Sequence, residues 1–511
     1  MQQLINKKNR DLVSKHVCFL LLFFVPFNRM AGQQPEHAVI VLDSTVRYQV
    51  IGHFGASDAW AGQFAGGWPA AKKNTIADWL FSTDTLLNGN PKGIGLSMWR
   101  YNLGAGSAEQ GAKSGIPDEW RRAALTLGQD PKLAAQNWFL QAAKQRGVQQ
   151  FLAFYNSPPI QFTRNGKAYA PKGRSNIDSS KYQDFADYTV AAINHLERAS
   201  GIKIDYLSPV NEPQWDWSDG TQEGCPYTNA EISALTKTFS KTFQENQLNT
   251  QLVITEAGQH TYLLHDGDKP GKGNQVNAFF DPASPQFVGD LTNVSRTIAS
   301  HSYFTTSPLD TALLLRKAVQ RRISDINNLA FWQSEYCILG DNAGEIRGEQ
   351  KDLGMNAALY LAKVVYQDLV AANASAWDWW TALSAYDYKD GLVYIQKSEK
   401  DGAYSDSKML WAMGNYSLFL RPGMQRISAT VNNTDLCVSA FRSDKGKQVI
   451  VIVNPTKQAK AIAIKQQTTA LPKGTLLRTY TTNETGNLHK NIAAADELKV
   501  PAEAVVSFII D

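Results

Sequence analysis

Cysteine is scarce in this sequence, with only four residues in 511. Cys18 lies near the N-terminus, and the other three, Cys225, Cys337 and Cys437, are an odd number that excludes a fully paired disulfide framework. None of them has the spacing of a structural metal site. Cys225 and Cys337 are either one bridge or two separate thiols, and the sequence favours two buried free thiols.

A large charge of one sign is also absent, because 51 Lys and Arg residues balance 47 Asp and Glu residues to a net charge of +4. So small a charge gives no reason to expect nucleic acid or an acidic polymer as a partner. A composition of 43% hydrophobic and 19% charged residues is that of a soluble globular protein, long enough for one large domain and one smaller domain. We expect a monomer.

Long apolar runs are restricted to one near the N-terminus. Residues 17–27 (VCFLLLFFVPF) are too few to span a bilayer, and they follow a basic stretch at 7–16. This layout predicts a signal peptide over residues 1–32 and a secreted or periplasmic protein that has no membrane contact after cleavage. Met30 departs from the small-residue cleavage pattern, so an uncleaved anchor is the alternative.

The most informative stretch is 208–215 (SPVNEPQW), which places Glu212 where a buried strand is expected to stop. An apolar run at 204–207 precedes it, and Pro213 interrupts the chain directly after the glutamate. A carboxylate at such a place is costly unless it is solvated, paired or used in chemistry. A salt bridge within the loop is the alternative role.

A second strand of the same kind, 329–336 (LAFWQSEY), places Glu335 at its end. The two glutamates are 123 residues apart. Strand–helix units occupy roughly 30 to 50 residues each, so about three units separate the glutamates. In a closed barrel of such units the two carboxyl groups can face each other across the mouth, which is the arrangement that glycoside hydrolysis requires.

Eight β-prone segments alternate with segments of helical spacing through the first four-fifths of the chain, which predicts an α/β fold, a parallel (β/α)8 TIM barrel. The expected strands lie at 53–58, 93–102, 151–156, 204–208, 252–256, 297–303, 329–335 and 374–380.

From about residue 426 the pattern changes to short strands with no helical segment between them, which predicts an antiparallel β-sandwich. Residues 38–50 alternate apolar and polar side chains in the same two-faced manner, so we expect this N-terminal strand to complete the sandwich. The predicted domains are therefore the sandwich strand at 33–50, the catalytic barrel at 51–420 and the C-terminal sandwich at 421–511.

Several motifs together resemble glycoside hydrolase family 30, a family of retaining (β/α)8 glycosidases with a side β-sandwich. They are Phe54-Gly55-Ala56-Ser57, Trp99-Arg100-Tyr101-Asn102-Leu103-Gly104, Asn156-Ser157-Pro158-Pro159, Ser208 to Pro213 and Ser334-Glu335-Tyr336. The resemblance covers nearly the whole chain after the leader. It implies that Glu212 is the general acid/base and Glu335 the nucleophile.

The resemblance also implies roles for other residues. Asn211 matches the residue that holds the sugar 2-hydroxyl and orients the nucleophile, and Arg100 matches the arginine beneath the nucleophile. The remaining substrate-binding candidates are His301 and Tyr303 on the sixth strand, Trp379 or Trp380 on the eighth, Asp58 after the first, and Trp215. No metal and no cofactor is expected.

The implied reaction needs Glu212 protonated and Glu335 ionised, and it retains the anomeric configuration. The implied partner is a polysaccharide or oligosaccharide. The turn at 156–159 and the stretches at 102–106 and 222–225 look most like endo-β-1,6-galactanases, with xylanase and β-1,6-glucanase as alternatives.

The sequence disfavours two other classes of function. A carbohydrate-binding barrel without activity is disfavoured because both glutamates are kept together with Asn211 and Arg100. An aldolase or a metal hydrolase would need a strand-end lysine or a His/Asp cluster, and the sequence has neither. Trp60, Trp68, Trp215 and Trp217 either line a groove for several sugar units or pack at the barrel rim.

Overall fold

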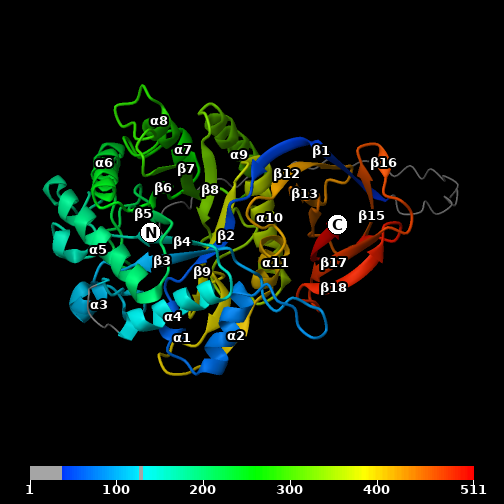
Figure 1. The fold of residues 1–511 in the computed structure, drawn as a ribbon, viewed down its shortest axis with the longest axis horizontal. Helices are drawn as coiled ribbons and strands as arrows, with labels where there is room; N and C mark the ends of the chain where they lie inside the picture. The colour runs from blue at the N-terminus through cyan, green and yellow to red at the C-terminus, as the bar shows by residue number, and fades with distance from the viewer. Residues whose placement is uncertain (1–36, 126–130) are drawn as a thin grey trace, which may run out of the picture. The chain divides into compact units, whose positions relative to one another are not determined.

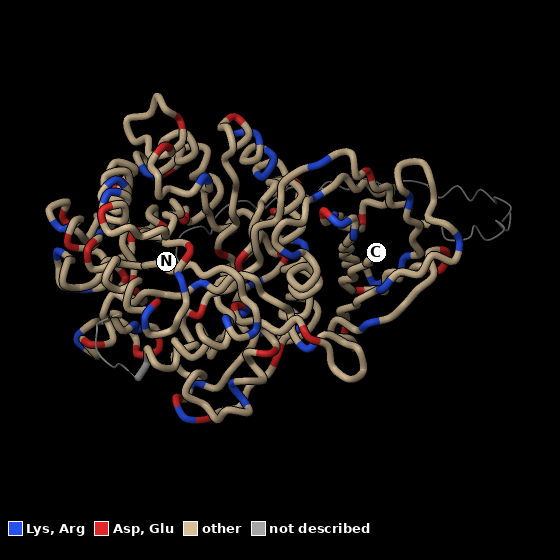
Figure 2. The backbone as a smooth tube through the Cα atoms, in the orientation of Figure 1, with Lys and Arg blue, Asp and Glu red and all other residues tan. Residues whose placement is uncertain are grey.

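The computed structural model describes residues 37–125 and 131–511. The predicted signal peptide at 1–32 lies outside the described residues. Within the described ranges, no helix has both the length and the apolar character needed to cross a bilayer. Basic and acidic residues are interspersed along the chain, in keeping with the small net charge (Figure 2).

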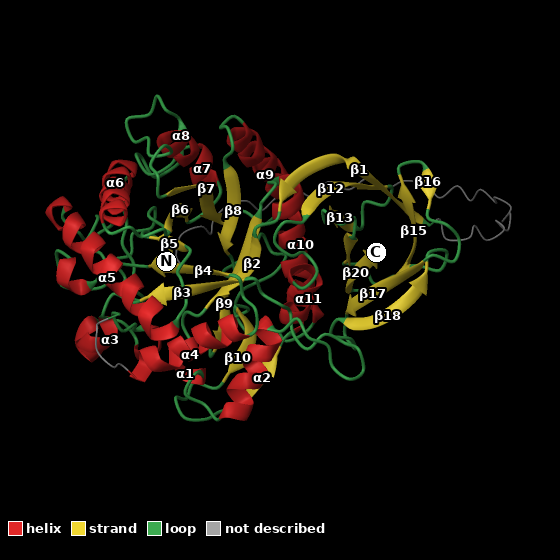
Figure 3. Cartoon of the chain, in the orientation of Figure 1, coloured by secondary structure: helices red, strands yellow, loops and turns green. Residues whose placement is uncertain are grey.

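Eight parallel strands form a closed barrel, which confirms the predicted (β/α)8 architecture (Figures 1 and 3). Neighbouring strands pair in chain order, and the ring closes because the last strand, β9, pairs with both β8 and β2. The barrel strands are β2 (His53–Ser57), β3 (Met98–Leu103), β4 (Gln150–Tyr155), β5 (Tyr206–Ser208), β6 (Gln251–Ala257), β7 (Val294–His301), β8 (Ala330–Glu335) and β9 (Ala376–Ser384).

Helices follow the strands and cover the outside of the barrel (Figure 3). They are α1 (Gly62–Ala65), α2 (Ala70–Phe81), α3 (Ser107–Gln110), α4 (Pro131–Gln145), α5 (Tyr182–Ser200), α6 (Asn229–Glu245), α7 (Thr261–Leu264), α8 (Gln275–Phe280), α9 (Leu309–Ser324), α10 (Met355–Ala371) and α11 (Lys408–Ser417). The start of α6 is a capping box, in which Thr228 accepts from the Glu231 backbone and the Glu231 carboxylate accepts from the Thr228 backbone.

The barrel strands are buried on both faces, and the alternation along β3 shows which residues point inward. Trp99 packs against Phe81 of α2, and the Tyr101 hydroxyl donates to Asn137 of α4 at 2.7 Å. These two side chains therefore belong to the helix layer. Arg100 lies on the opposite face of the strand, inside the barrel, because successive side chains of a strand alternate.

Ten further strands form a curled, mostly antiparallel sheet, which confirms the predicted sandwich domain. They are β1 (Ala38–Val50), β12 (Gln425–Val431), β13 (Cys437–Arg442), β14 (Gln448–Asn454), β15 (Lys460–Gln466), β16 (Thr469–Ala470), β17 (Leu476–Thr482), β18 (His489–Ala494), β19 (Lys499–Val500) and β20 (Ala504–Ile510). The N-terminal strand β1 completes this sheet, since it pairs antiparallel with β12 and parallel with β15. Its inward side chains Ile40 and Leu42 join a separate apolar core.

Two strands that were not predicted follow the barrel. β10 (Gly391–Ile395) lies beside β9 and pairs with it in parallel, and β11 (Tyr404–Asp406) pairs antiparallel with β10. Their short lengths explain why no clear sequence period marks them. Asn415 of α11 then donates to the Tyr480 carbonyl and the Ser507 hydroxyl, so the last barrel helix is hydrogen-bonded to the sandwich.

Candidate active site

Glu212 lies in the turn after β5, at the mouth of the barrel. Its backbone has a φ of 43°, in the left-handed region that a residue with a side chain seldom adopts. Its N–H donates to the Glu256 carbonyl at 2.8 Å, which fixes this conformation against the neighbouring strand β6. Only 7% of the surface of this residue is exposed. Strain that is held in place at a strand end is typical of a functional position.

Glu335 is the last residue of β8 and faces Glu212 across the mouth. A carboxylate oxygen of Glu335 lies within 4.8 Å of one of Glu212. Arg100 Nη1 donates to Glu335 Oε2 at 3.2 Å, and the Tyr303 hydroxyl donates to Oε1 at 3.2 Å. These two donors stabilise the ionised carboxylate and fix its direction.

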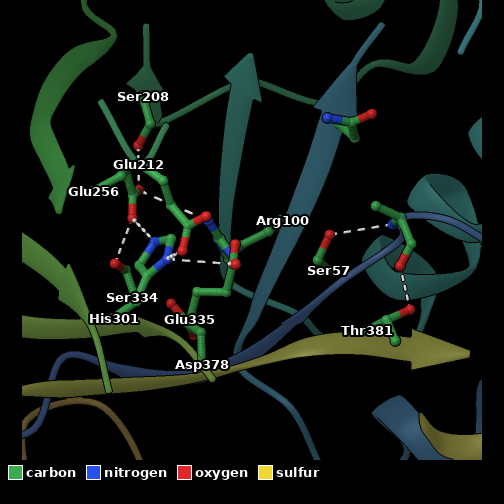
Figure 4. Close-up of polar contacts among 12 residues, drawn as sticks. Ser57, Arg100, Ser208, Glu212, Glu256, His301, Ser334, Glu335, Asp378 and Thr381 are labelled. Carbon is green, nitrogen blue, oxygen red and sulfur yellow. Dashed lines mark hydrogen bonds and ion pairs between the residues drawn. The ribbon is translucent and has the colours of Figure 1, made fainter. Parts of the chain in front are cut away.

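His301, at the end of β7, lies between three carboxyl groups (Figure 4). Its Nδ1 is 2.8 Å from Glu212 Oε1 and 3.4 Å from Glu335 Oε1, and its Nε2 is 3.1 Å from Glu256 Oε2. Burial by itself lowers the pKa of His301, but Glu335, Glu212 and Glu256 together raise it to about 10. The imidazole is therefore a cation at neutral pH.

Glu256, the penultimate residue of β6, is a third buried glutamate that the sequence analysis did not place in the site. It accepts from the Ser208 hydroxyl at 2.5 Å and from the Ser334 hydroxyl, and its Oε1 is 3.7 Å from Arg100 Nη2. Burial opposes ionisation, but Arg100 and His301 lower its pKa to about 2. The signal that could have found it is the same as for the other two glutamates: a carboxylate at the end of an apolar strand.

The charges of this cluster set its protonation. Two buried cations, Arg100 and His301, contact the three carboxyl groups, so the cluster is neutral when one carboxyl carries a proton. Burial raises the pKa of Glu335 to about 7, against the opposing effects of His301 and Arg100. Glu256 is the group most firmly held in the ionised state, whereas burial favours the protonated form of Glu335.

A cavity of about 540 Å³ opens beside the facing pair. Its walls combine aromatic side chains, which suit sugar rings, with amide, hydroxyl and carboxylate groups. The lining residues are Asn211, Glu212, Trp215, Asp216, Trp217, Ser218, Asp219, Thr221, Gln222, Tyr303, Phe304, Glu335, Leu339 and Trp380. Asn211 Oδ1 is buried and has no hydrogen-bond partner among the described residues, so it is available to a ligand.

The two tryptophans of β9 have different environments. Trp380 lines the cavity and packs edge-on against Trp60, with the ring centroids 5.5 Å apart. Trp379 is fully buried, and its Nε1 donates to the Asp390 carbonyl at 2.5 Å. Trp380 is therefore the candidate for the aromatic platform, and Trp379 belongs to the packing outside the ring.

Of the four tryptophans considered for a sugar groove, Trp215 and Trp217 line the cavity. Trp60 and Trp68 are only 4% and 1% exposed and do not line this cavity, which favours the rim-packing role for both. Asp58 is also absent from the cavity wall, because its carboxylate accepts hydrogen bonds from the Asn102 backbone and the Gln136 side chain.

Cys225 and Cys337 are both buried and free, so no bridge joins them.

The separation of the facing carboxyl groups limits the chemistry. Direct attack on a sugar requires a carboxyl separation of about 5 to 5.5 Å, whereas an intervening water requires about 6.5 Å or more. The short distance here suits direct attack by one carboxylate while the other donates a proton. Glu212, His301 and Glu335 also lie close enough to share a metal ion, but here the two ring nitrogens of His301 contact glutamate carboxylates.

Comparison with known proteins adds to this geometry. Residues 37–394 match the family model described as O-Glycosyl hydrolase family 30, and residues 423–508 match the Glycosyl hydrolase family 30 beta sandwich domain. The endo-beta-1,6-galactanase of Hypocrea rufa is 23% identical over 435 residues, covering 80% of this chain and 81% of the relative. The glucuronoxylanase XynC of Bacillus subtilis (strain 168) is 23% identical over 533 residues, covering 98% of this chain and 99% of the relative. The crystal structure of a conserved exported protein from Bacteroides fragilis has a TM-score of 0.84 at 31% identity, covering 92% of this chain and 100% of that chain.

Proposed function

The chain belongs to O-glycosyl hydrolase family 30, and from this membership we propose that it is a secreted, retaining endo-β-1,6-galactanase. The single observation that carries the retaining mechanism is the facing pair Glu212 and Glu335, with carboxylate oxygens within 4.8 Å. Asn211, which directly precedes Glu212, offers an unpaired amide oxygen to the sugar hydroxyl beside the reacting carbon.

In the first step, a Glu335 carboxylate oxygen forms a bond to the anomeric carbon while the bond to the leaving oxygen breaks. Glu212 gives its proton to that oxygen, so the leaving sugar departs as a neutral alcohol. Arg100 and Tyr303 hold the Glu335 carboxylate in the attacking direction. The His301 cation, in contact with both glutamates, stabilises the negative charge that moves to Glu212.

In the second step, ionised Glu212 removes a proton from an incoming water. The water oxygen then bonds to the anomeric carbon, and the ester bond to Glu335 breaks. Both glutamates return to their starting protonation states. Two inversions at the same carbon give net retention.

The wall of the cavity supports a neutral sugar as substrate. Asp216 and Asp219 are exposed in the loop after Glu212, and neither Lys nor Arg occurs among the described residues that line the cavity. A uronic acid side group would meet the negative charge of these two aspartates. This favours β-1,6-galactan, the polymer named for the Hypocrea rufa relative, over glucuronoxylan.

Export is part of the proposal. The residue pattern at 1–32 supports it, and so does the likeness to a protein described as exported. N-terminal sequencing of protein recovered outside the cell, with a start near residues 31–33, tests it.

We expect the purified enzyme to release oligosaccharides from β-1,6-galactan with a kcat/KM at least about tenfold above that for β-1,6-glucan or xylan, because poorly matched sugars leave buried polar groups unpaired. Chromatography of products from the three polymers measures this, with glucuronoxylan as the acidic control. Preference for glucan or xylan would contradict the galactan assignment and leave the mechanism standing.

Replacing Arg100 by Gln is expected to move the acid limb of the kcat/KM profile to higher pH by about one unit or more. Arg100 lowers the pKa of Glu335, so its removal lets the nucleophile protonate, and activity fall, at a higher pH. The measurement is a pH profile with an activated aryl glycoside, which does not need the acid. Arg100→Lys keeps the positive charge and should therefore show a smaller shift than Arg100→Gln. Arg478→Gln, on the sandwich, should cause no shift. An unshifted limb in a folded Arg100→Gln protein would refute the role of Arg100.

A further inference from the structure

Two asparagines near the barrel mouth have side chains that the mechanism above does not use. Asn102 lies near the end of β3, and Asn156 directly follows β4. They are 0% and 3% exposed, respectively. In each side chain, both the amide oxygen and the amide nitrogen lack a hydrogen-bond partner among the described residues. Buried amides without partners are rare in folded proteins, and each one calls for an explanation.

Asn102 points into the barrel. It lies two residues after Arg100, whose guanidinium contacts Glu335, so the two side chains share one face of β3. The intervening Tyr101 points the other way, toward Asn137 of α4. Asn102 therefore lies two residues closer to the barrel mouth than Arg100, which contacts Glu335.

Strand alternation also places the side chain of Asn156 inside the barrel, directly after the neighbouring strand β4. The Tyr155 hydroxyl lies 3.2 Å from the Thr189 hydroxyl of α5, outside the ring. Phe154 points inward, because the Arg100 guanidinium lies 4.6 Å from its ring centroid and Trp380 packs against it. Asn102 and Phe154 are register partners, so Asn156 follows on the inward side and nearer the mouth.

The backbone of Asn102 is held from both sides. Its N–H donates to Asp58 Oδ1 at 2.9 Å, and its carbonyl accepts from Gln136 Nε2 at 2.8 Å. Gln136 Nε2 also donates to Asp58 Oδ2 at 2.8 Å, so the two side chains that hold this backbone are hydrogen-bonded to each other. A fixed backbone beneath an unpaired side chain is the arrangement of a preorganised binding group. It also gives Asp58 a role as a positioning residue.

From this geometry we propose that Asn102 and Asn156 bind hydroxyl groups of the sugar that lies against Trp380, and that they thereby select which sugar is accepted. The inference rests on the proposed function in taking the ligand to be a saccharide. A primary amide offers two donors and an acceptor, and a sugar hydroxyl is both donor and acceptor, so the two groups are complementary. A sugar that lacks the matching hydroxyl leaves the amide buried and unpaired, and is rejected.

The test uses Glu335→Gln as a background that binds without turnover. Calorimetry with β-1,6-galacto-, β-1,6-gluco- and xylo-oligosaccharides gives the Kd values. We expect Asn102→Ala and Asn156→Ala each to weaken binding of the preferred oligosaccharide by about tenfold or more. Asn246→Ala, at the end of α6, serves as a control that should bind as the background does.

Monodeoxy analogues separate recognition from a structural role. Removing the hydroxyl that an asparagine binds should weaken binding in the background protein but have little further effect in the variant that lacks that asparagine. Asn102→Asp and Asn156→Asp keep the size of the side chain and lose the donors, and they serve if an alanine variant does not fold. Equal losses for every deoxy analogue, or no loss in the variants, would overturn this inference alone. Failure of every oligosaccharide to bind would overturn the proposed function as well.

Discussion

Glu335→Gln is expected to reduce hydrolysis of every substrate by roughly 10⁴-fold or more, because the amide cannot form the covalent bond to the anomeric carbon. The substitution is nearly isosteric, and Tyr303 and Arg100 remain in place. Good leaving groups should not restore activity, since the lost group is the nucleophile itself. Initial rates on the preferred polymer and on an activated aryl glycoside measure the effect.

A slow substrate that traps the glycosyl-enzyme gives an independent readout. A 2-fluoro glycoside should add its sugar mass to the wild-type protein at a peptide containing Glu335, and should not label Glu335→Gln. The matched control is Glu349→Gln, an exposed glutamate in the loop after β8, which should keep wild-type rates. Labelling of another carboxylate would assign the nucleophile elsewhere.

Glu212→Gln is expected to lower hydrolysis of the polymer by about 10² to 10⁴-fold while sparing the first step on substrates with very good leaving groups. Those substrates leave without a proton, so they do not need the acid. The second step still needs a base for water, and the glycosyl-enzyme should accumulate as a burst of released leaving group. Stopped-flow release of the aryl group measures the burst.

Azide distinguishes a lost base from a damaged fold. It is a nucleophile that needs no deprotonation, so it should rescue turnover of Glu212→Gln on the aryl glycoside and give a product of retained configuration. Asp216→Asn, in the same loop, should show neither the burst nor the rescue. Equal residual activity of Glu212→Gln and Glu335→Gln on the polymer would contradict the division of roles.

The candidate site was predictable where one strand carries its own signal. Glu212 and Glu335 each end an apolar run, and the number of intervening units places those ends at one mouth. Glu256 ends a similar run, but the sequence analysis does not place it in the site. Its importance comes from contacts with Arg100, His301 and two serines, which are brought together from five strands.

The tryptophans show a second limit. Strand alternation implies that Trp379 and Trp380 face opposite sides, but it does not say which side is the interior. Trp60 and Trp68 are large apolar side chains near strand ends, which is compatible with a groove or with rim packing. Only the neighbouring elements, such as the contact of Trp60 with Trp380, decide between these roles.

The sequence by itself determined the architecture, the order of the strands and the two glutamates, because burial patterns, turn residues and spacing are local properties of the chain. The tertiary structure alone decided the distance between the two carboxyl groups, the cationic state of His301 and the unpaired amides of Asn102 and Asn156. Each of these depends on side chains from different strands at distances of a few ångströms. Closure of the barrel sets those distances, and no single segment encodes them.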